Sequence, residues 1–389
     1  MHAALVRAQE IAPWLSEVRR SLHRIPELAF AEFETSTFLR KELSSLGLPF
    51  RQAKDSTGII ALVRGDHTGP VVALRADMDA LPGNELTGLP FRSVHPGVVH
   101  ACGHDAHMAM VLGAARLLQA DPPAGTVVIL FQPAEERGQG ARCMIEAGAL
   151  DGVAAIFGGH VTHSYVSGHL MVTSGVVTSQ SDRFSVRVTG KAGHAARPHE
   201  AIDAVSIAGF LIHGVQTLSR RLNPLHPAVI SINQVKAGTA ANVIAGEATL
   251  EGSVRTSTSD ARIHLHEGLQ RIAKAAAVLH DAGVEIEIHG GNPPVVNTSR
   301  ESALAADVVR EVFGHSSLLT SEPPSLGSED FSLYLQQVPG CYVRIGARRP
   351  DWEYVPLHSP CFTIDEDALP VGAAYFEQVA RRALFAFKG

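Results

Sequence analysis

The feature that most constrains the fold is a series of short, uninterrupted apolar runs flanked by Gly, Pro and Asp. They cover residues 58–63, 71–74, 127–131 and 154–157. Runs of this length are typical of strands that are buried on both faces of a sheet. Stretches with helical spacing lie between them, at about 105–120 and 138–149. Strands and helices that alternate in this way predict β-α-β units, and therefore an α/β fold with a mostly parallel sheet.

The pattern changes near residue 182. Phe184, Val186 and Val188 alternate with polar residues, which predicts a strand with one solvent-exposed face. The elements expected after it are a helix at 200–221, strands at 228–236 and 246–256, a helix at 259–281 and a strand at 284–289. This β-α-β-β-α-β order is typical of a ferredoxin-like α+β domain. We therefore expect an α/β domain formed by residues 1–181 and 295–389, interrupted by a small α+β domain at 182–294.

Composition and charge argue against several classes of protein. The formal net charge is −6 and no long basic run occurs, so no electrostatic footprint for nucleic acid or for a membrane surface is present. The apolar runs are too short to span a bilayer, and the first residues lack the pattern of a signal peptide. The cysteines at 102, 143, 341 and 361 are scattered, which favours a reducing cytoplasm over a disulfide scaffold.

Histidine is unusually frequent. The chain has 20 histidines in 389 residues, roughly twice ordinary usage. Histidine is the commonest metal ligand and also moves protons near neutral pH, so the places where it gathers are candidate sites.

Residues with metal-binding chemistry gather where the predicted strands end. The segments 75–79, 133–136 and 158–160 each follow a predicted strand. Segment 100–107 opens a predicted helix, and segment 357–360 adds one more histidine. Ligands of open α/β sheets bind outside the carboxyl ends of the strands. Cys, His and Glu gathered there have the composition of a transition-metal site.

Taken singly, some of these residues have a simpler explanation. His160 or His358 alone would be a surface residue, and the carboxylates of 77–79 would cap a loop. The sequence 102–104 is more specific, because a thiol and an imidazole two residues apart can face one ion. The adjacent carboxylates of 135–136 repel each other unless a cation lies beside them. Taken together, these residues predict a metal site.

At this point the chain resembles a known family. The motifs that carry the resemblance are LHRIPELAFAEFET (22–35), RADMDALP (75–82), HACGHDAH (100–107), FQPAEE (131–136), GGH (158–160), GHAARPH (193–199), AANVI (240–244), GSEDF (327–331) and LHSP (357–360). Their types and order are similar to those of the dinuclear metallo-amidohydrolases. That family includes hippurate hydrolases, auxin-conjugate hydrolases and bacterial N-acyl-L-amino-acid amidohydrolases. The resemblance spans nearly the whole chain.

The resemblance implies a two-metal catalytic domain and an inserted lid domain that dimerises. The metal ligands that it implies are Cys102, His104, Glu136, His160 and His358. It makes Glu135 the general base, which accepts a proton from the attacking water and delivers it to the leaving amine. The resemblance implies two divalent transition-metal ions, and manganese or zinc are the ions expected for this family. The mixed sulfur, nitrogen and oxygen ligands would also suit nickel or cobalt.

The resemblance also assigns roles around the ligands. His194 of the lid would hold the substrate carbonyl, reaching across the dimer. Asn242 and Arg255 would meet the amino-acid carboxylate, although Arg255 equally fits a surface position on a strand. Asp79 resembles a residue that orients a ligand imidazole. His107 lies on the same helix face as His104, and we interpret it as a support rather than a ligand.

The chain departs from the family after His160. Relatives carry a tryptophan–proline-like stretch there, whereas this chain has residues 161–168 in the sequence VTHSYVSG. His163 and Tyr165 therefore lie near the expected site where relatives have other residues, which bears on the specificity for the acyl group. Asp203-Ala204 also replaces a common Asp-Pro.

The function expected from the sequence is metal-dependent hydrolysis of N-acyl-L-amino acids to a carboxylic acid and a free amino acid. We expect a small-molecule substrate, no nucleic-acid or membrane partner, and a homodimer or larger assembly formed through the lid. Within the same family, a dipeptidase or carboxypeptidase is the alternative.

Two readings from other classes stay open. A cysteine amidase would use Cys102 with His104 or His107 and would survive a chelator. It leaves the pair 135–136 without a role. A binding protein that keeps the fold would be expected to lose Glu135 or Cys102, and both are present.

Overall fold

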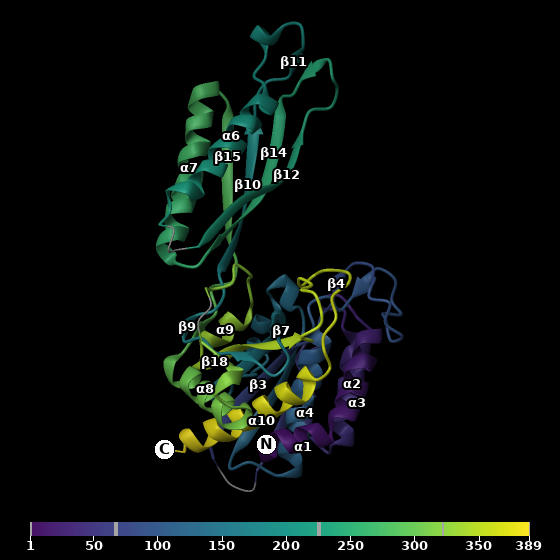
Figure 1. Cartoon of the computed structure of the whole chain (residues 1–389). Coiled ribbons are helices and arrows are strands. Elements are labelled where there is room, and N and C mark those ends of the chain that lie inside the picture. Colours follow the sequence, from purple (N-terminus) through teal and green to yellow (C-terminus); the bar gives the residue numbers. More distant parts are fainter. Residues whose placement is uncertain (1, 66–68, 224–226, 321–322, 389) are drawn as a thin grey trace. The chain divides into compact units, whose positions relative to one another are not determined.

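The computed structural model describes residues 2–65, 69–223, 227–320 and 323–388. The chain divides into two compact units (Figure 1). The first comprises Met1–Val177, Val296–Pro323 and Glu329–Gly389, and the second comprises Thr178–Val295 and Pro324–Ser328. Each unit has an apolar core of its own, so each can be described by itself.

The first unit is built on an eight-stranded sheet with the order β1-β2-β6-β3-β7-β18-β8-β17. In that order the strands are Phe50–Gln52, Ile59–Arg64, Thr126–Gln132, Val71–Asp77, Val153–Val166, Gly340–Arg348, Leu170–Met171 and Leu318–Leu319. The four central strands β6, β3, β7 and β18 are parallel to one another. β2 runs antiparallel to β6, and β8 antiparallel to β18. The predicted α/β fold with a mostly parallel sheet is thus confirmed.

Two central strands are longer than the apolar runs that predicted them. β3 continues to Asp77 and β7 to Val166, so His160 lies inside a strand rather than in the segment after it. The extension of β7 is paired with β18, in which Arg344 lies opposite His160. The sequence prediction was wrong here because the partner strand lies far away in the chain, and a local apolar run carries no sign of it.

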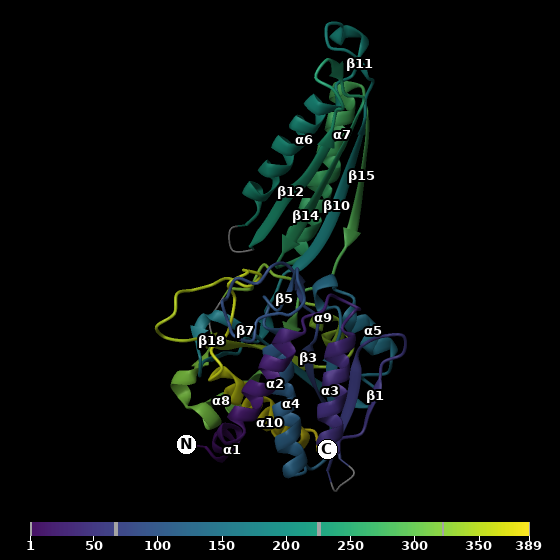
Figure 2. The ribbon, with the colours of Figure 1, turned by 90° about the vertical axis from the view of Figure 1, so that its right-hand side faces the viewer.

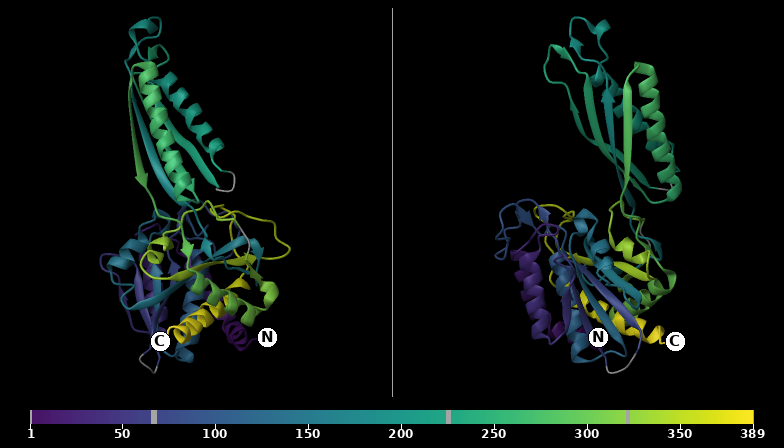
Figure 3. Two further views of the ribbon diagram at one scale, coloured as in Figure 1. Left: turned by 90° about the vertical axis from the view of Figure 1, so that its left-hand side faces the viewer. Right: turned by 180° about the vertical axis from the view of Figure 1, so that it is seen from behind.

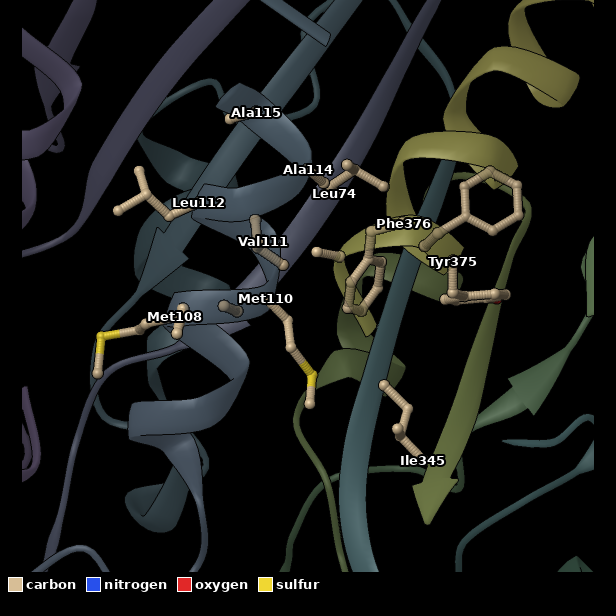
Figure 4. Packing of buried hydrophobic residues seen from close by; sticks show 14 of the residues in the cluster. Leu74, Met108, Met110, Val111, Leu112, Ala114, Ala115, Ile345, Tyr375 and Phe376 are labelled. Carbon is tan, nitrogen blue, oxygen red and sulfur yellow. The ribbon is translucent and has the colours of Figure 1, made fainter. Parts of the chain in front are cut away.

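Helices pack against this sheet. They are α1 (Ala3–Glu10), α2 (Ala12–Arg24), α3 (Phe33–Ser45), α4 (His104–Ala120), α5 (Gly140–Glu146), α8 (Ser299–Phe313), α9 (Phe331–Leu335) and α10 (Ala368–Ala386). α4 and α10 lie side by side against β3 and β18, with Met110 and Phe376 among the buried side chains between them (Figure 4). The helices at the two ends of the chain, α1 and α10, both belong to this unit (Figure 3).

α4 is buried on nearly all sides, which accounts for its run of apolar residues. Even so, among the described residues no helix is both long and apolar enough to cross a bilayer. Packing on all sides fixes the axis of α4. It therefore also fixes the position of His104 at the start of the helix.

The second unit is a four-stranded antiparallel sheet with α6 and α7 on one face (Figure 2). Along the chain its elements are β10 (Gln180–Thr189), α6 (Ala204–Leu218), β12 (Ala228–Ala237), β14 (Glu247–Thr256), α7 (Ser259–His280) and β15 (Gly283–Gly290). The sheet order is β12-β14-β10-β15. Phe184, Val186 and Val188 of β10 are buried, while Arg183 and Arg187 on its other face are exposed. This alternation is the reason that β10 has one covered face.

Short strand pairs complete the two units. In the second unit β11 (Gly193–His194) pairs with β13 (Val243–Ile244). In the first unit β4 (Leu81–Pro82) pairs with β5 (Val98–Val99), and β9 (Gly175–Val176) with β16 (Val296–Asn297).

Candidate metal centre and active site

The turn into α4 brings a thiol and two imidazoles together. Gly103 has φ +86°, a conformation that favours glycine, and a Cβ there would lie 2.4 Å from the side chain of Val161. This turn lets Cys102 and His104 face the same point. The Sγ atom of Cys102 lies 3.3 Å from Nε2 of His160. Ligand atoms of Cys102, His104 and His160 all lie within 4.8 Å of one another, a first group able to hold a metal ion.

Cys102 also belongs to a second group. Its ligand atom lies within 4.8 Å of those of Glu136 and His358. Nε2 of His358 is 3.4 Å from Oε1 of Glu136, and Nε2 of His104 is 4.0 Å from the same oxygen. All five residues predicted as ligands therefore lie together. Because Cys102 is common to both groups, they define two neighbouring positions for a cation.

Two buried polar atoms of these groups favour the presence of a bound metal ion. Nε2 of His104 and Oε1 of Glu136 are buried and have no hydrogen-bond partner within the described part of the chain. Leaving such atoms unpaired is costly, and a bound cation would satisfy both. The neighbouring side chains of Cys102 and Glu136 raise the pKa of His358 to about 10. An imidazole that favours a positive charge so strongly lies where a metal ion would also be stabilised.

Main-chain carbonyls orient two of the imidazoles. Nδ1 of His104 lies 2.7 Å from the carbonyl oxygen of Asp79, and Nδ1 of His160 lies 2.7 Å from that of Val161. Because a carbonyl can only accept, each Nδ1 carries the proton and each Nε2 offers a lone pair to the site. Burial lowers the pKa of His160 well below its ordinary value, which keeps it in the neutral form that binds metals.

Besides this contact of its carbonyl with the imidazole of His104, Asp79 has a second role through its carboxylate. It accepts the backbone N–H of Glu135 on one oxygen and that of Glu136 on the other, each at 3.0 Å. Oδ1 of Asp79 is 3.5 Å from Nδ1 of His104, so the carbonyl at 2.7 Å is the better partner of that imidazole. Asp79 is fully buried. Its carboxylate therefore fixes the turn that presents both glutamates.

Glu32 holds the same turn from the other side. Ala134 has φ +53°, and its N–H donates to Oε1 of Glu32 at 2.9 Å. The other oxygen of Glu32 accepts the hydroxyl of Thr57 at 2.6 Å. The role of Glu32 was not predicted, although Glu32 lies inside the motif at 22–35. The motif contains Glu32, but Ala134, the partner of Glu32, is about one hundred residues away in the chain.

His107 uses both ring nitrogens inside the protein. Its Nδ1 donates to Asp77 at 2.6 Å, and its Nε2 accepts the N–H of Val161 at 2.9 Å. No lone pair is left for a metal ion. His107 therefore supports the backbone beside His160, which agrees with its interpretation as a support.

Glu135 lies beside two more carboxylates. Oxygens of Glu135, Glu329 and Asp330 all lie within 4.8 Å of one another. Burial, and then the charges of Glu329 and Asp330, raise the pKa of Glu135 well above its ordinary value. A carboxyl whose proton affinity is raised in this way suits a group that takes up and releases a proton near neutral pH.

A guanidinium offsets part of the negative charge of this acidic cluster. Arg75 is fully buried and donates to Glu329 and to Asp330 at 3.0 Å, and to Asp77 at 2.7 Å. Arg75, Glu329 and Asp330 lie inside motifs of the sequence, but their roles could not be predicted, because their pairing joins segments more than 250 residues apart.

Cys102 does not have the properties of a nucleophile. Burial raises the pKa of its thiol, whereas a catalytic cysteine needs a lowered pKa. This argues against the cysteine amidase. A thiol of this kind becomes a thiolate when a cation binds to it.

The substrate-binding residues expected from the sequence all lie in the second unit. His194 is exposed on β11, and its Nδ1 accepts the N–H of Ala196 at 3.0 Å. Asn242 is exposed beside it, since the N–H of Ala195 donates to the Asn242 carbonyl. Arg255 lies apart on β14, half-buried, and donates to the carbonyl of Leu326 at 2.9 Å. None of the three belongs to the ligand groups described above.

Comparison with known proteins identifies similar chains. The sequence model of peptidase family M20/M25/M40 matches residues 73–382. A solved structure of a Bacillus subtilis protein, described as a dinuclear metal-binding peptidase of the M20 family, superposes with a TM-score of 0.84. It is 37% identical and covers 97% of this chain and 99% of its own.

Similar curated proteins differ in their named activities. The N-acetyl-L-cysteine deacetylase of Bacillus subtilis is 38% identical, over 94% of this chain and 87% of that protein. Thermostable carboxypeptidase 1 of Saccharolobus solfataricus is 37% identical over 94% of each chain. The IAA-amino acid hydrolase ILR1-like 4 of Arabidopsis thaliana is 36% identical, over 99% of this chain and 89% of that protein.

Proposed function

Because the chain belongs to peptidase family M20/M25/M40, we propose that it is a metal-dependent amidohydrolase that cleaves the amide bond of N-acyl-L-amino acids. The products are a carboxylic acid and a free amino acid. The observation that carries this proposal is the pair Glu135 and Glu136, which one buried carboxylate holds in a fixed turn. One member of the pair lies in a ligand group, and the other lies beside it with a raised pKa.

Two divalent ions would be held by Cys102, His104, Glu136, His160 and His358. We propose manganese or zinc, and nickel or cobalt would also suit the mixed ligand set. When bound, ions of this kind act as Lewis acids toward the amide carbonyl and make water more acidic.

Glu135 is proposed to carry the proton during hydrolysis. It accepts the proton of the attacking water and later donates it to the nitrogen of the leaving amino acid. The carboxylates of Glu329 and Asp330 favour its protonated form, while Asp79 keeps its backbone in place. His194 would hold the substrate carbonyl, and Asn242 and Arg255 would bind the amino-acid carboxylate.

We propose that residues 1–181 and 295–389 form the catalytic domain, and that residues 182–294 form a ferredoxin-like lid through which two chains dimerise. The surface of the second unit supports this. Val205 and Phe210 of α6 are 50% and 38% exposed, and Val229 and Val235 of the edge strand β12 are 43% and 45% exposed. An edge strand beside an apolar helix face favours pairing with a second copy.

A cytoplasmic location is part of the proposal. It rests on the four cysteines, none of which forms a disulfide. Unpaired cysteines are typical of reducing compartments.

A pair of adjacent variants tests the catalytic proposal. E135Q should keep two metal ions per chain and lose at least about 100-fold in turnover, the usual scale for a general acid–base. E136Q is the matched control, since it should lose metal as well as activity. A chelator should abolish the activity of the wild type. An active preparation without metal, or an E135Q variant with normal turnover, would contradict the proposal.

The substrate class is tested with a panel of N-acyl amino acids and dipeptides, in which the released amine is measured. A dipeptidase or carboxypeptidase is the second candidate, because a carboxypeptidase is among the similar proteins. Faster cleavage of dipeptides or peptides than of every N-acyl amino acid would favour that candidate.

Mixing two inactive variants tests the dimer. If His194 serves the partner's site, E135Q mixed with H194A should regain activity, because some mixed dimers contain one site with both native residues. If His194 serves its own chain, no mixed dimer has both residues in one site. Absence of recovery after proven subunit exchange would refute the assignment across the dimer.

A further inference from the structure

His163 lies three residues after the ligand candidate His160, and both of its ring nitrogens have partners in the protein. It lies in β7 with a side chain that is 2% exposed. Its Nε2 lies 2.7 Å from the carbonyl oxygen of Thr363, and its Nδ1 lies 3.2 Å from the backbone nitrogen of Val355. Since a carbonyl only accepts and an amide only donates, Nε2 carries the proton and Nδ1 is the acceptor.

The two partners of His163 lie on either side of His358 in the chain. Residues 349–367, between β18 and α10, form neither helix nor strand. Within them a single imidazole bonds the backbone at both Val355 and Thr363. It therefore closes the nine-residue segment 355–363, which contains His358 near its middle.

Ring contacts and a charged side chain hold His163 and the segment 355–363 together. The ring of His163 lies 4.9 Å from that of Phe362 and 6.2 Å from that of Trp352, measured between centroids. Arg348 donates to the carbonyl of His163 at 2.8 Å and to that of Trp352 at 2.7 Å. The contacts on His163 thus join both arms of the loop to β7.

His358 itself has few other restraints. Its N–H donates to the carbonyl of Ala101 at 2.8 Å, its φ is +67°, and its side chain is 54% exposed. A residue other than glycine keeps such a φ only where its surroundings impose it. The surroundings that impose it here include the contact with Ala101, the N–H of Leu86 that donates to the carbonyl of Pro360 at 2.8 Å, and the closed segment.

We propose that His163 is a positioning residue for His358, and that the ion held by Cys102, Glu136 and His358 depends on it. The proposal rests on the ligand role of His358 in the proposed function. It predicts that breaking the two hydrogen bonds of His163 weakens one ion and leaves the ion held by Cys102, His104 and His160 unchanged.

The test uses cobalt(II) alone as the probe, titrated into metal-free full-length protein, with the stoichiometry and the Kd of each ion as the readout. H163F keeps a ring against Phe362 and Trp352 but removes both hydrogen bonds. We expect it to weaken one of the two ions by about 10- to 100-fold, the usual effect of removing a support of a metal ligand. H163Q, which keeps a donor near the position of Nε2, should show a smaller loss.

Two controls separate the explanations. H358A removes the ligand itself and should abolish binding of the same ion, and adding H163F to H358A should leave the Kd of the remaining ion unchanged, because H163F acts through His358. V379A deletes buried methyl groups in α10 and should lower stability without changing either Kd.

Each outcome has one meaning. If H358A keeps both ions at wild-type affinity, the ligand assignment of the proposed function is wrong. If H358A loses an ion while H163F and H163Q bind both ions normally, the positioning role of His163 is overturned and the ligand assignment stands. A 10- to 100-fold loss of affinity for the remaining ion when H163F is added to H358A also overturns it. If H163F does not fold, H163Q is carried through the same cycle.

Discussion

Replacing Asp79 by Asn tests how the glutamate pair is held. The change keeps the size of the side chain but replaces one carboxylate oxygen by an amide NH2. Each oxygen of Asp79 accepts one backbone N–H, that of Glu135 or that of Glu136, at 3.0 Å. In D79N one of these two N–H groups would face a donor instead of an acceptor, at a site that excludes water.

The size of the effect follows from that contact. A hydrogen bond to a charged group contributes about 1.5–3 kcal/mol, and an unsatisfied buried donor costs about 1–3 kcal/mol. The two terms overlap, because both describe the same N–H group. We therefore expect D79N to lower the free energy of unfolding by about 2–4 kcal/mol. The remaining bond, to a neutral amide oxygen, should also hold its glutamate less firmly.

The assay is urea unfolding of the metal-free protein, so that lost metal binding does not add to the result. The control is D203N, because Asp203 also accepts one backbone N–H, that of Val205 at the start of α6. Asn caps helices as well as Asp does, so D203N should change stability by about 0.5 kcal/mol or less. A D79N protein as stable as D203N, with normal metal content, would refute the reasoning.

Three further changes have defined outcomes. G103A places a Cβ at φ +86° and 2.4 Å from a valine side chain of β7, so it should cost about 1–3 kcal/mol in urea unfolding and lower the metal content measured by elemental analysis. R75M leaves the buried acidic pair 329–330 without its cation and should cost about 3–5 kcal/mol or prevent soluble expression; wild-type stability would contradict the role of Arg75. Burial alone would raise the pKa of Asp182, but its hydrogen bonds to Arg262 and to a backbone N–H, together with the charge of Arg262, lower it. The contribution of Asp182 to stability is therefore complete above its unfolded pKa, near 4, and is lost as the pH falls through the lower folded pKa. We expect D182N to be less stable than the wild type at pH 7, and this difference in stability should shrink below about pH 4. A difference that stays constant from pH 7 to pH 2 would contradict the last prediction.

The sequence predicted those parts of the fold whose signal is local. Each buried strand of the parallel centre that precedes residue 160 shows an uninterrupted apolar run, and α4 begins where the cysteine–histidine motif meets a helical pattern. The continuation of β7 past His160 was missed because it depends on pairing with β18. Residues 324–328 belong to the second unit, although they follow the segment expected to form it, and only their contacts place them there.

The residues of the site also divide into those with a local sequence signal and those that depend on a distant partner. The five ligand candidates could be found from the sequence because short motifs contain them, and the structure brings them together. Apart from His107 and Asp79, the supports could not be found from the sequence, because each acts through a partner far away in the chain. Arg75 meets Glu329 across more than 250 residues, and His163 meets the two arms of the 349–367 loop across nearly 200. Whether each candidate ligand binds a metal stays a prediction.

The central place of β18 in the sheet has a consequence for how the chain folds during its synthesis on the ribosome. β7 ends at Val166, and its neighbour β18 begins at Gly340, so about 170 residues are synthesised before the sheet can close. At roughly 5–20 residues per second this takes about 10–35 s. During that time one edge of β7 stays unpaired, while the second unit, which has its own core, can already fold. Nascent chains and fragments that stop before β18 are therefore the forms most prone to aggregate.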